Sequence, residues 1–123
     1  MKRWIGRALV AIGMLHTVFG VVVFSSVWAE LFREGVLNTV NQQPMRSVAY
    51  WFLFFGFLLL LLGALVDWCE AQATTLPAFL GWGLLAMTLV GVAVMPISGM
   101  WLALIPAIGL IRQQVASAPK VLA

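Results

Sequence analysis

The chain has 123 residues, a formal net charge of +3, and 63% hydrophobic against 9% charged side chains. Soluble domains average roughly 45–50% apolar and about 25% charged residues, so this composition excludes an ordinary soluble protein. The seven basic residues are scattered, which argues against nucleic-acid binding, and the single cysteine excludes an intrachain disulfide or a cysteine metal cluster.

Four apolar stretches predict an all-α protein, a transmembrane four-helix bundle that forms one domain over residues 1–123. A bilayer core of roughly 30 Å needs about 20 apolar residues in a helix, which leaves room for four crossings. We expect the spans at about 4–27, 48–66, 76–95 and 97–111, and an outer loop at 28–47.

The first span contains His16, the only histidine of the chain, and residues 8–27 contain no Asp, Glu, Lys or Arg. This apolar stretch is longer than the 7–15 residues of a signal-peptide core, so we expect a retained span. Ionisable groups inside a membrane are costly and mark functional sites by default. His16 is therefore the main candidate for a ligand or proton site.

Glycines recur every seven residues in the first two spans, at positions that fall near one helix face. They include Gly13 and Gly20 around His16, Gly56 and Gly63 in the second span, and Gly91 follows in the third. Small residues let helices approach closely in a membrane, so these glycines predict helix-packing faces. We expect His16 to face protein rather than lipid.

Three roles for His16 remain open from the sequence. The structural role is a buried hydrogen bond to a backbone carbonyl or to a hydroxyl such as that of Thr88. The functional roles are contact with a polar atom of a lipophilic ligand and proton transfer during transport. Axial haem ligation is the least favoured, because it needs Met87 or a second His16 from a homodimer. We expect no metal and no cofactor.

The outer loop begins with a segment, Glu30 to Glu34, that can form a helical turn with Arg33 close to Glu30. Gly35 would end that turn. The loop is either an interfacial connector or a lid over a ligand site.

At the inner level of the membrane, Arg7 is expected to pair with Asp67 or Glu70, because charges near a membrane usually find opposite partners. The ion pair is expected to be a structural clasp between adjacent helices, whereas the two carboxylates, three residues apart, could suggest acid–base work. No nucleophile, base and orienting residue fall at matching depths, so we expect a non-catalytic protein.

The last span is short, because 15 residues of helix cover only about 22 Å. It needs a thin bilayer, partial burial, or a helical extension through Arg112 and Gln113. Pro106 lies within it and is expected to kink it or to leave a backbone carbonyl free for another partner.

Basic residues gather on the cytoplasmic side of membrane proteins, which predicts the orientation. With both termini in the cytoplasm, the inner side holds Lys2, Arg3, Arg7, Arg112 and Lys120, and the outer side holds Arg33 and Arg46.

Five segments together carry a family resemblance: 13–20 (GMLHTVFG), 50–57 (YWFLFFGF), 63–68 (GALVDW), 80–82 (LGW) and 95–101 (MPISGMW). Over most of residues 3–112 the chain resembles a bacterial family of small four-span membrane proteins known only as a domain of unknown function. The resemblance implies a four-span bundle in the bacterial inner membrane, and no activity. Small four-span multidrug transporters are similar in size, but they carry an essential glutamate in the first span, where this chain has His16.

The leading functional hypothesis is a non-catalytic membrane protein, either a helix-packing partner or a binder of a lipophilic ligand. Its expected partners are membrane lipid and either a second copy or another membrane protein, with no nucleic acid. The alternative is a proton-coupled transporter that works as a dimer around His16. A membrane-embedded lipid isomerase or reductase is the weaker alternative, because no second acid or base lies at the depth of His16.

Overall fold

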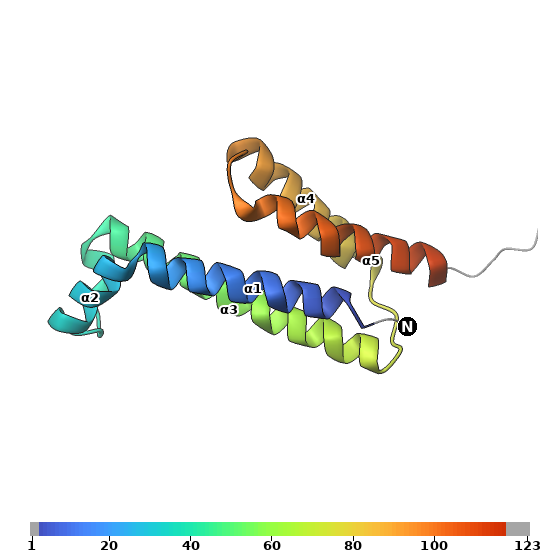
Figure 1. The fold of residues 1–123 in the computed structure, drawn as a ribbon, viewed down its shortest axis with the longest axis horizontal. Coiled ribbons are helices and arrows are strands. Elements are labelled where there is room, and N and C mark those ends of the chain that lie inside the picture. Colours follow the sequence, from blue (N-terminus) through green and yellow to red (C-terminus); the bar gives the residue numbers. More distant parts are fainter. Residues whose placement is uncertain (1–2, 118–123) are drawn as a thin grey trace, which may run out of the picture.

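The computed structural model describes residues 3–117, and all regular structure among them is helical (Figure 1). The elements in chain order are α1 (Ile5–Val23), α2 (Ser25–Glu34), the 3-10 helix η1 (Val40–Gln42), α3 (Pro44–Ala71), α4 (Ala78–Val94), the 3-10 helix η2 (Gly99–Ala103) and α5 (Leu104–Ser117). The predicted all-α class is confirmed for these residues.

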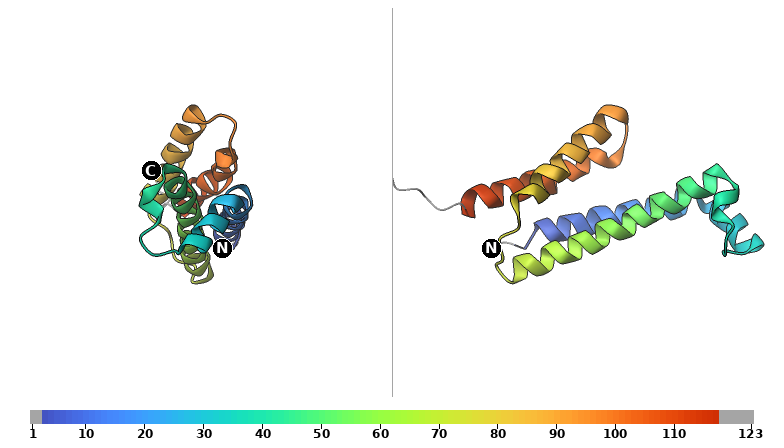
Figure 2. Two further views of the ribbon diagram at one scale, coloured as in Figure 1. Left: turned by 90° about the vertical axis from the view of Figure 1, so that its left-hand side faces the viewer. Right: turned by 180° about the vertical axis from the view of Figure 1, so that it is seen from behind.

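The long helices form two antiparallel hairpins, α1 with α3 and α4 with α5 (Figures 1 and 2). The hairpins meet chiefly through α1 and α5, and η2 also approaches α1. In α4, side chains such as Leu80 and Leu84 pack against the shared core. The described helices are thus two paired hairpins, and a regular four-helix bundle remains a prediction.

The first helix is shorter than the expected span 4–27, because α1 ends at Val23 and the chain turns at Phe24. The backbone amide of Phe24 and the indole N–H of Trp28 both donate to the carbonyl of Gly20, at 3.2 and 3.3 Å. A run of valines precedes the turn and a pair of serines follows it. Both residue types are weak helix formers. The chain then continues as the separate helix α2, which Gly35 ends with a φ of 101°.

The remaining helices also differ from the expected spans in length. α3 has 28 residues and extends beyond 48–66 at both ends, whereas α4 has only 17. η2 and α5 together give an apolar helical segment of 18 residues, Gly99–Ala116, so the last segment is not the shortest. The structure therefore contains the expected extension through Arg112. Among residues 3–117, three segments are long and apolar enough to cross a membrane: α1, α3 and Gly99–Ala116.

Pro106 lies close to the point where the 3-10 helix η2 passes into α5. It lies in the first turn of α5, which begins at Leu104. A proline is tolerated there because the first turn of a helix has no intrahelical acceptor for its amide nitrogens. Ser98 precedes η2 and caps it by accepting a hydrogen bond from the amide of Met100 at 3.3 Å.

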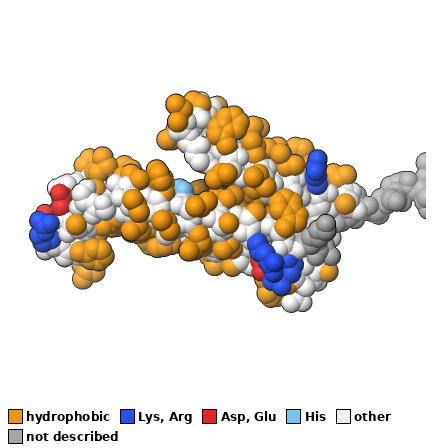
Figure 3. Space-filling model, in the orientation of Figure 1, with side chains coloured by type: hydrophobic (Ala, Val, Ile, Leu, Met, Phe, Trp, Pro, Cys, Tyr) orange, Lys and Arg blue, Asp and Glu red, His pale blue; other side chains and the backbone are white. Residues whose placement is uncertain are grey.

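The buried core is small and lies near the ends of the helices where the two hairpins meet. It consists of Ile5 and Leu9 of α1, Val66 of α3, Leu110 of α5, and Leu76 before α4. Trp4 also connects the hairpins, since a Cβ on Gly109 of α5 would lie 2.5 Å from its ring. Most other large apolar side chains are exposed, so the surface of the protein is largely hydrophobic (Figure 3).

The two helices of the first hairpin approach closely along their glycines. A Cβ on Gly63 would lie 2.7 Å from the amide nitrogen of Val10, and one on Gly13 would lie 3.0 Å from Leu60. Toward the other end, a Cβ on Gly20 would lie 2.8 Å from the ring of Phe52. Glycines on both helices therefore allow close backbone contact over nearly the whole length of α1.

This close contact predicts that Gly63→Ala separates α1 from α3 and destabilises the protein by about 1–3 kcal/mol, the usual cost of overpacking. The measurement is thermal unfolding in mild detergent. The matched control is Gly83→Ala in α4, where an added Cβ meets nothing within 4 Å. Because alanine is the better helix former, the control should be neutral or more stable by about 0.5–1 kcal/mol. Equal effects of the two substitutions would contradict the close contact.

Candidate functional site

His16 lies on α1 and bonds directly to α3. Its Nε2 atom is 2.9 Å from the carbonyl oxygen of Phe52. The imidazole also stacks on the ring of Phe52, with centroids 3.9 Å apart and planes 13° from parallel. Phe55 meets the imidazole edge-on at 5.4 Å. The structure thus provides the carbonyl contact that was one of the roles expected for His16.

Gly56 on α3 makes room for this arrangement. A Cβ there would lie 2.5 Å from Oγ1 of Thr17 and 3.2 Å from Cδ2 of His16. The Thr17 hydroxyl donates to the carbonyl of Gly13 at 2.7 Å, one turn back in its own helix. Any side chain at position 56 would therefore push away the part of α1 that carries His16.

The hydrogen bond determines which ring nitrogen of His16 carries a proton. A backbone carbonyl oxygen only accepts hydrogen bonds, so Nε2 must be the donor. Among the described residues, no acidic side chain forms an ion pair with His16.

A groove of about 540 Å³ runs along α3. Its lining is aromatic and aliphatic: Trp51, Phe54, Phe55, Phe57, Leu58 and Leu61. Phe55 belongs both to this groove and to the surroundings of His16. Ligand pockets in proteins commonly have volumes of roughly 300–1,000 Å³ and mostly apolar linings with a few polar groups.

The structure does not bring Thr88 and His16 together by a hydrogen bond. Thr88 is buried in α4, and its hydroxyl donates to the carbonyl of Leu84 in the same helix at 2.7 Å. Gly91, also in α4, lies against the side chain of Met100 in η2. Both residues therefore contribute to packing within the second hairpin. Of the two alternatives for a structural hydrogen bond of His16, a backbone carbonyl or a hydroxyl such as that of Thr88, the structure shows the carbonyl.

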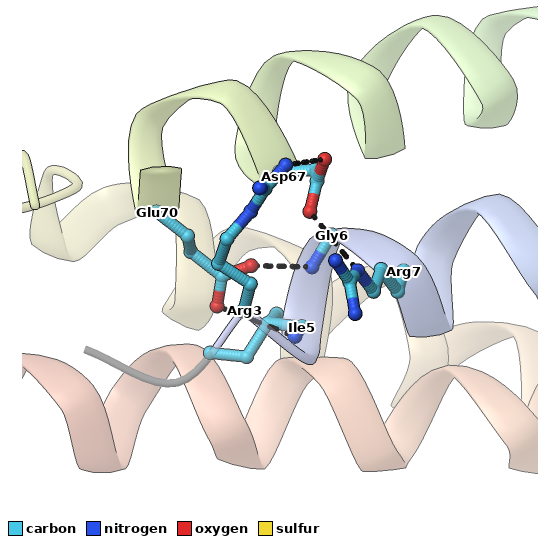
Figure 4. Close-up of polar contacts among 6 residues, drawn as sticks. All are labelled: Arg3, Ile5, Gly6, Arg7, Asp67 and Glu70. Atoms are coloured by element: carbon cyan, nitrogen blue, oxygen red, sulfur yellow. Dashed lines mark hydrogen bonds and ion pairs between the residues drawn. The ribbon is translucent and has the colours of Figure 1, made fainter. Parts of the chain in front are cut away.

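The inner charged residues divide into two sets of contacts (Figure 4). Asp67 pairs with Arg7, with Oδ1 and Nε 3.6 Å apart, and with Arg3, with Oδ2 and an Nη atom 2.6 Å apart. Glu70 does not pair with Arg7. Its carboxylate instead accepts hydrogen bonds from the backbone amides of Ile5 and Gly6, at 3.3 and 2.9 Å.

Glu70 thus caps the beginning of α1 from another helix. The first amides of a helix have no intrahelical acceptor, and they carry a partial positive charge that favours a carboxylate. Trp4, at the N-cap position, makes no side-chain cap hydrogen bond, so Glu70 takes over that task. Its side chain is 2% exposed, which makes these hydrogen bonds harder for solvent to replace.

A second ion pair joins the outer ends of the helices, and the sequence analysis missed it. Arg46, at the start of α3, is buried and lies 2.6 Å from Glu34 at the end of α2. A second nitrogen of its guanidinium donates to the carbonyl of Thr39 at 3.4 Å. The expected local contact of Glu30 with Arg33 is absent from the ion pairs of the described residues. Spacing favours local pairs, and only the folded loop brings residues 34 and 46 together.

The described residues contain no group of three His, Cys, Asp or Glu side chains placed to hold a metal ion. Cys69 is a free thiol that packs against the core near the inner charged residues.

The cap predicts that Glu70→Ala destabilises the protein by about 1–3 kcal/mol, because two buried amides lose a charged acceptor. Hydrogen exchange of the Ile5 and Gly6 amides should also become faster. Thermal unfolding and exchange in detergent measure the two effects. Glu30→Ala is the control, since Glu30 is exposed and a surface substitution usually changes stability by less than about 0.5 kcal/mol. Unchanged exchange at both amides would contradict the cap.

Comparisons with other sequences agree with the family resemblance and add no activity. Neither the curated proteins nor the solved structures gave a match. Residues 1–117 match a family of unknown function, DUF6463. The match covers nearly the whole chain, and so the protein belongs to the DUF6463 family of unknown function.

Proposed function

We propose that this chain is a bacterial inner-membrane protein that crosses the bilayer four times and binds a lipophilic ligand without transforming it. The observation that carries the ligand proposal is the apolar groove on α3, one of whose lining residues, Phe55, also contacts His16 of α1.

The distribution of charge supports the membrane placement. Ionisable side chains of the described residues gather at the two ends of the molecule, with an apolar band between them in which His16 is the exception (Figure 3). Arg46 and Asp67 mark the two ends of this band on α3. They are 21 residues apart, about 31 Å at 1.5 Å per residue, which matches a hydrocarbon core of roughly 30 Å.

The short helix α2 supports the same placement. The axis of α2 points in a sharply different direction from that of α1 (Figure 1). The helix carries the exposed Phe32 together with the charged residues Glu30 and Arg33. Amphipathic helices of this kind lie in the plane of the membrane interface. The excess of basic residues at the opposite end favours cytoplasmic termini.

The groove supports binding rather than chemistry. None of the six lining residues is a histidine or carries a charge, and the polar groups beside them are the Trp51 indole and the neighbouring Tyr50. Acid–base catalysis requires a second group within reach of the substrate. The nearest charged residue of α1 on the inner side of His16, Arg7, is nine positions away, about 13 Å along the helix.

Helix association is the second candidate function, and the aromatic face of α3 favours it. Trp51, Phe54 and Phe57 are all exposed. Tyr50 stacks on Phe54 with centroids 4.3 Å apart, which holds part of this face in a fixed arrangement. A helix of a second copy or of another protein would bury these rings instead of a ligand.

The orientation predicts the labelling pattern of single cysteines placed in a Cys69→Ser background. Asn41→Cys, in the outer loop, should react with a membrane-impermeant maleimide in intact spheroplasts. Gln72→Cys, between α3 and α4, should react only after lysis. Both positions are exposed in the structure, so the membrane alone should decide reactivity. The reverse pattern would contradict cytoplasmic termini.

The groove predicts that farnesyl methyl ether, a lipophilic probe without a donor, binds the protein in phosphatidylcholine nanodiscs. Leu58→Trp should fill the groove and weaken binding by about tenfold or more, as expected for losing roughly 1.4 kcal/mol of apolar contact. Saturation-transfer NMR measures the binding. Leu65→Trp is the matched control, because Leu65 is also exposed on α3, at 54% against 61% for Leu58, but lies outside the groove. Absence of binding to the unsubstituted protein would overturn the proposal.

A further inference from the structure

We infer that the inner end of the first hairpin binds the phosphate of an anionic phospholipid, of which phosphatidylglycerol is the simplest, through the guanidinium group of Arg7. The site shares no residue with the groove on α3. The inference goes beyond the proposed ligand binding and rests only on the membrane placement of the chain.

Two arginines share one carboxylate at this end of the hairpin, and Figure 4 shows Asp67 between them. Arg3 lies 2.6 Å from Oδ2 of Asp67, whereas Nε of Arg7 lies 3.6 Å from Oδ1, which is beyond hydrogen-bonding distance. Among the described residues, this long ion pair is the only polar contact of the Arg7 side chain. The donors of Arg7 are therefore open to another acceptor.

The exposed part of this cluster is cationic. The side chains of Arg7 and Arg3 are 68% and 43% exposed, whereas that of Asp67 is 25% exposed. The other acid, Glu70, is buried, and its carboxylate is bonded to backbone amides of α1. Figure 3 shows the arginines at this surface with only a small acidic area beside them. Two positive charges and one negative charge therefore face the surroundings, an excess of one positive charge.

The position of Arg7 matches the level of the lipid phosphates. Arg7 contacts Asp67, which marks the inner end of the apolar band, so its guanidinium lies where the hydrocarbon core meets the head groups. Ala11, Met14 and Val18 follow on the same face of α1 and are all exposed. Val18 lies about 16 Å along the helix from Arg7, roughly half of a 30 Å core. A lipid of the inner leaflet can therefore place its phosphate at Arg7 and an acyl chain along this face.

The excess of positive charge selects an anionic head group. A planar guanidinium can donate two parallel hydrogen bonds to one phosphate. In phosphatidylcholine the phosphate is already neutralised by the cation of the same head group, whereas in phosphatidylglycerol it has no such partner. Basic side chains at a membrane surface attract anionic lipids for this reason.

The test compares phosphatidylglycerol with phosphatidylcholine of identical acyl chains, each titrated into the full chain in mild detergent. Native mass spectrometry measures the dissociation constant of the first bound lipid. One excess positive charge predicts that phosphatidylglycerol binds about fivefold more tightly. Arg7→Gln leaves Arg3 neutralised by Asp67, so the preference should disappear. Arg33→Gln is the matched control, because it removes an exposed arginine at the other end of the molecule, and it should keep the preference.

Asp67→Asn should change the preference in the opposite direction. It removes the one exposed carboxylate and leaves both arginines without an acid, so phosphatidylglycerol should gain about fivefold more over phosphatidylcholine. Loss of a structural contact alone would not move the lipid preference in opposite directions in the Arg7 and Asp67 variants. In the unsubstituted protein, raising ammonium acetate from about 0.05 to about 0.5 M should reduce the preference, because salt screens exposed charges.

A further arm of the test uses glycerophosphoglycerol, which is the same head group without acyl chains. It should not displace phosphatidylglycerol at the same concentration, and displacement would overturn the lipid assignment in favour of a soluble phosphodiester. Equal affinities for the two lipids, or a preference that persists in Arg7→Gln, would overturn the head-group inference. These results would leave the groove on α3 untouched, because its test uses an uncharged probe in phosphatidylcholine.

Discussion

Close approach of α1 and α3 is the contact on which the rest of the structure depends. In a bilayer, apolar side chains gain little by leaving lipid for another helix, so packing and hydrogen bonds between helices have to hold them together. Glycines on both helices remove the side chains that would keep the backbones apart. The same closeness brings His16 within hydrogen-bonding distance of the Phe52 carbonyl and places Glu70 under the first amides of α1.

Polar contacts at the two ends complete this hairpin in different ways. At the inner end, Asp67 and Glu70 of α3 hold the start of α1 through ion pairs and backbone hydrogen bonds. At the outer end, the buried Arg46 forms an ion pair with Glu34 at the end of α2, and this pair holds the loop that follows. Between these ends the surface is apolar, and the second hairpin covers only part of it. The aromatic face of α3 stays uncovered there and includes the exposed rings of Trp51, Phe54 and Phe57.

Local sequence was a reliable guide to some contacts and a poor guide to others. The spacing of Gly13, Gly20, Gly56 and Gly63 placed them on faces that do meet across the hairpin. Arg7 and Asp67 were expected to pair, and they lie within 3.6 Å. The cap by Glu70 was missed, because an acceptor 64 residues from the amide that it binds leaves no local signal. The pair of Arg46 with Glu34 was missed for the same reason.

The sequence by itself determined that the chain is helical, that its apolar segments match a membrane, and that the one histidine among them needs a partner. These properties follow from composition, periodicity and the cost of a polar group in apolar surroundings. Only the tertiary structure decided that the partner is the carbonyl of Phe52, and that Thr88 bonds within its own helix. The physical reason is that periodicity specifies a face of a helix. The partner on the other side depends on the depth, rotation and bends of two helices together.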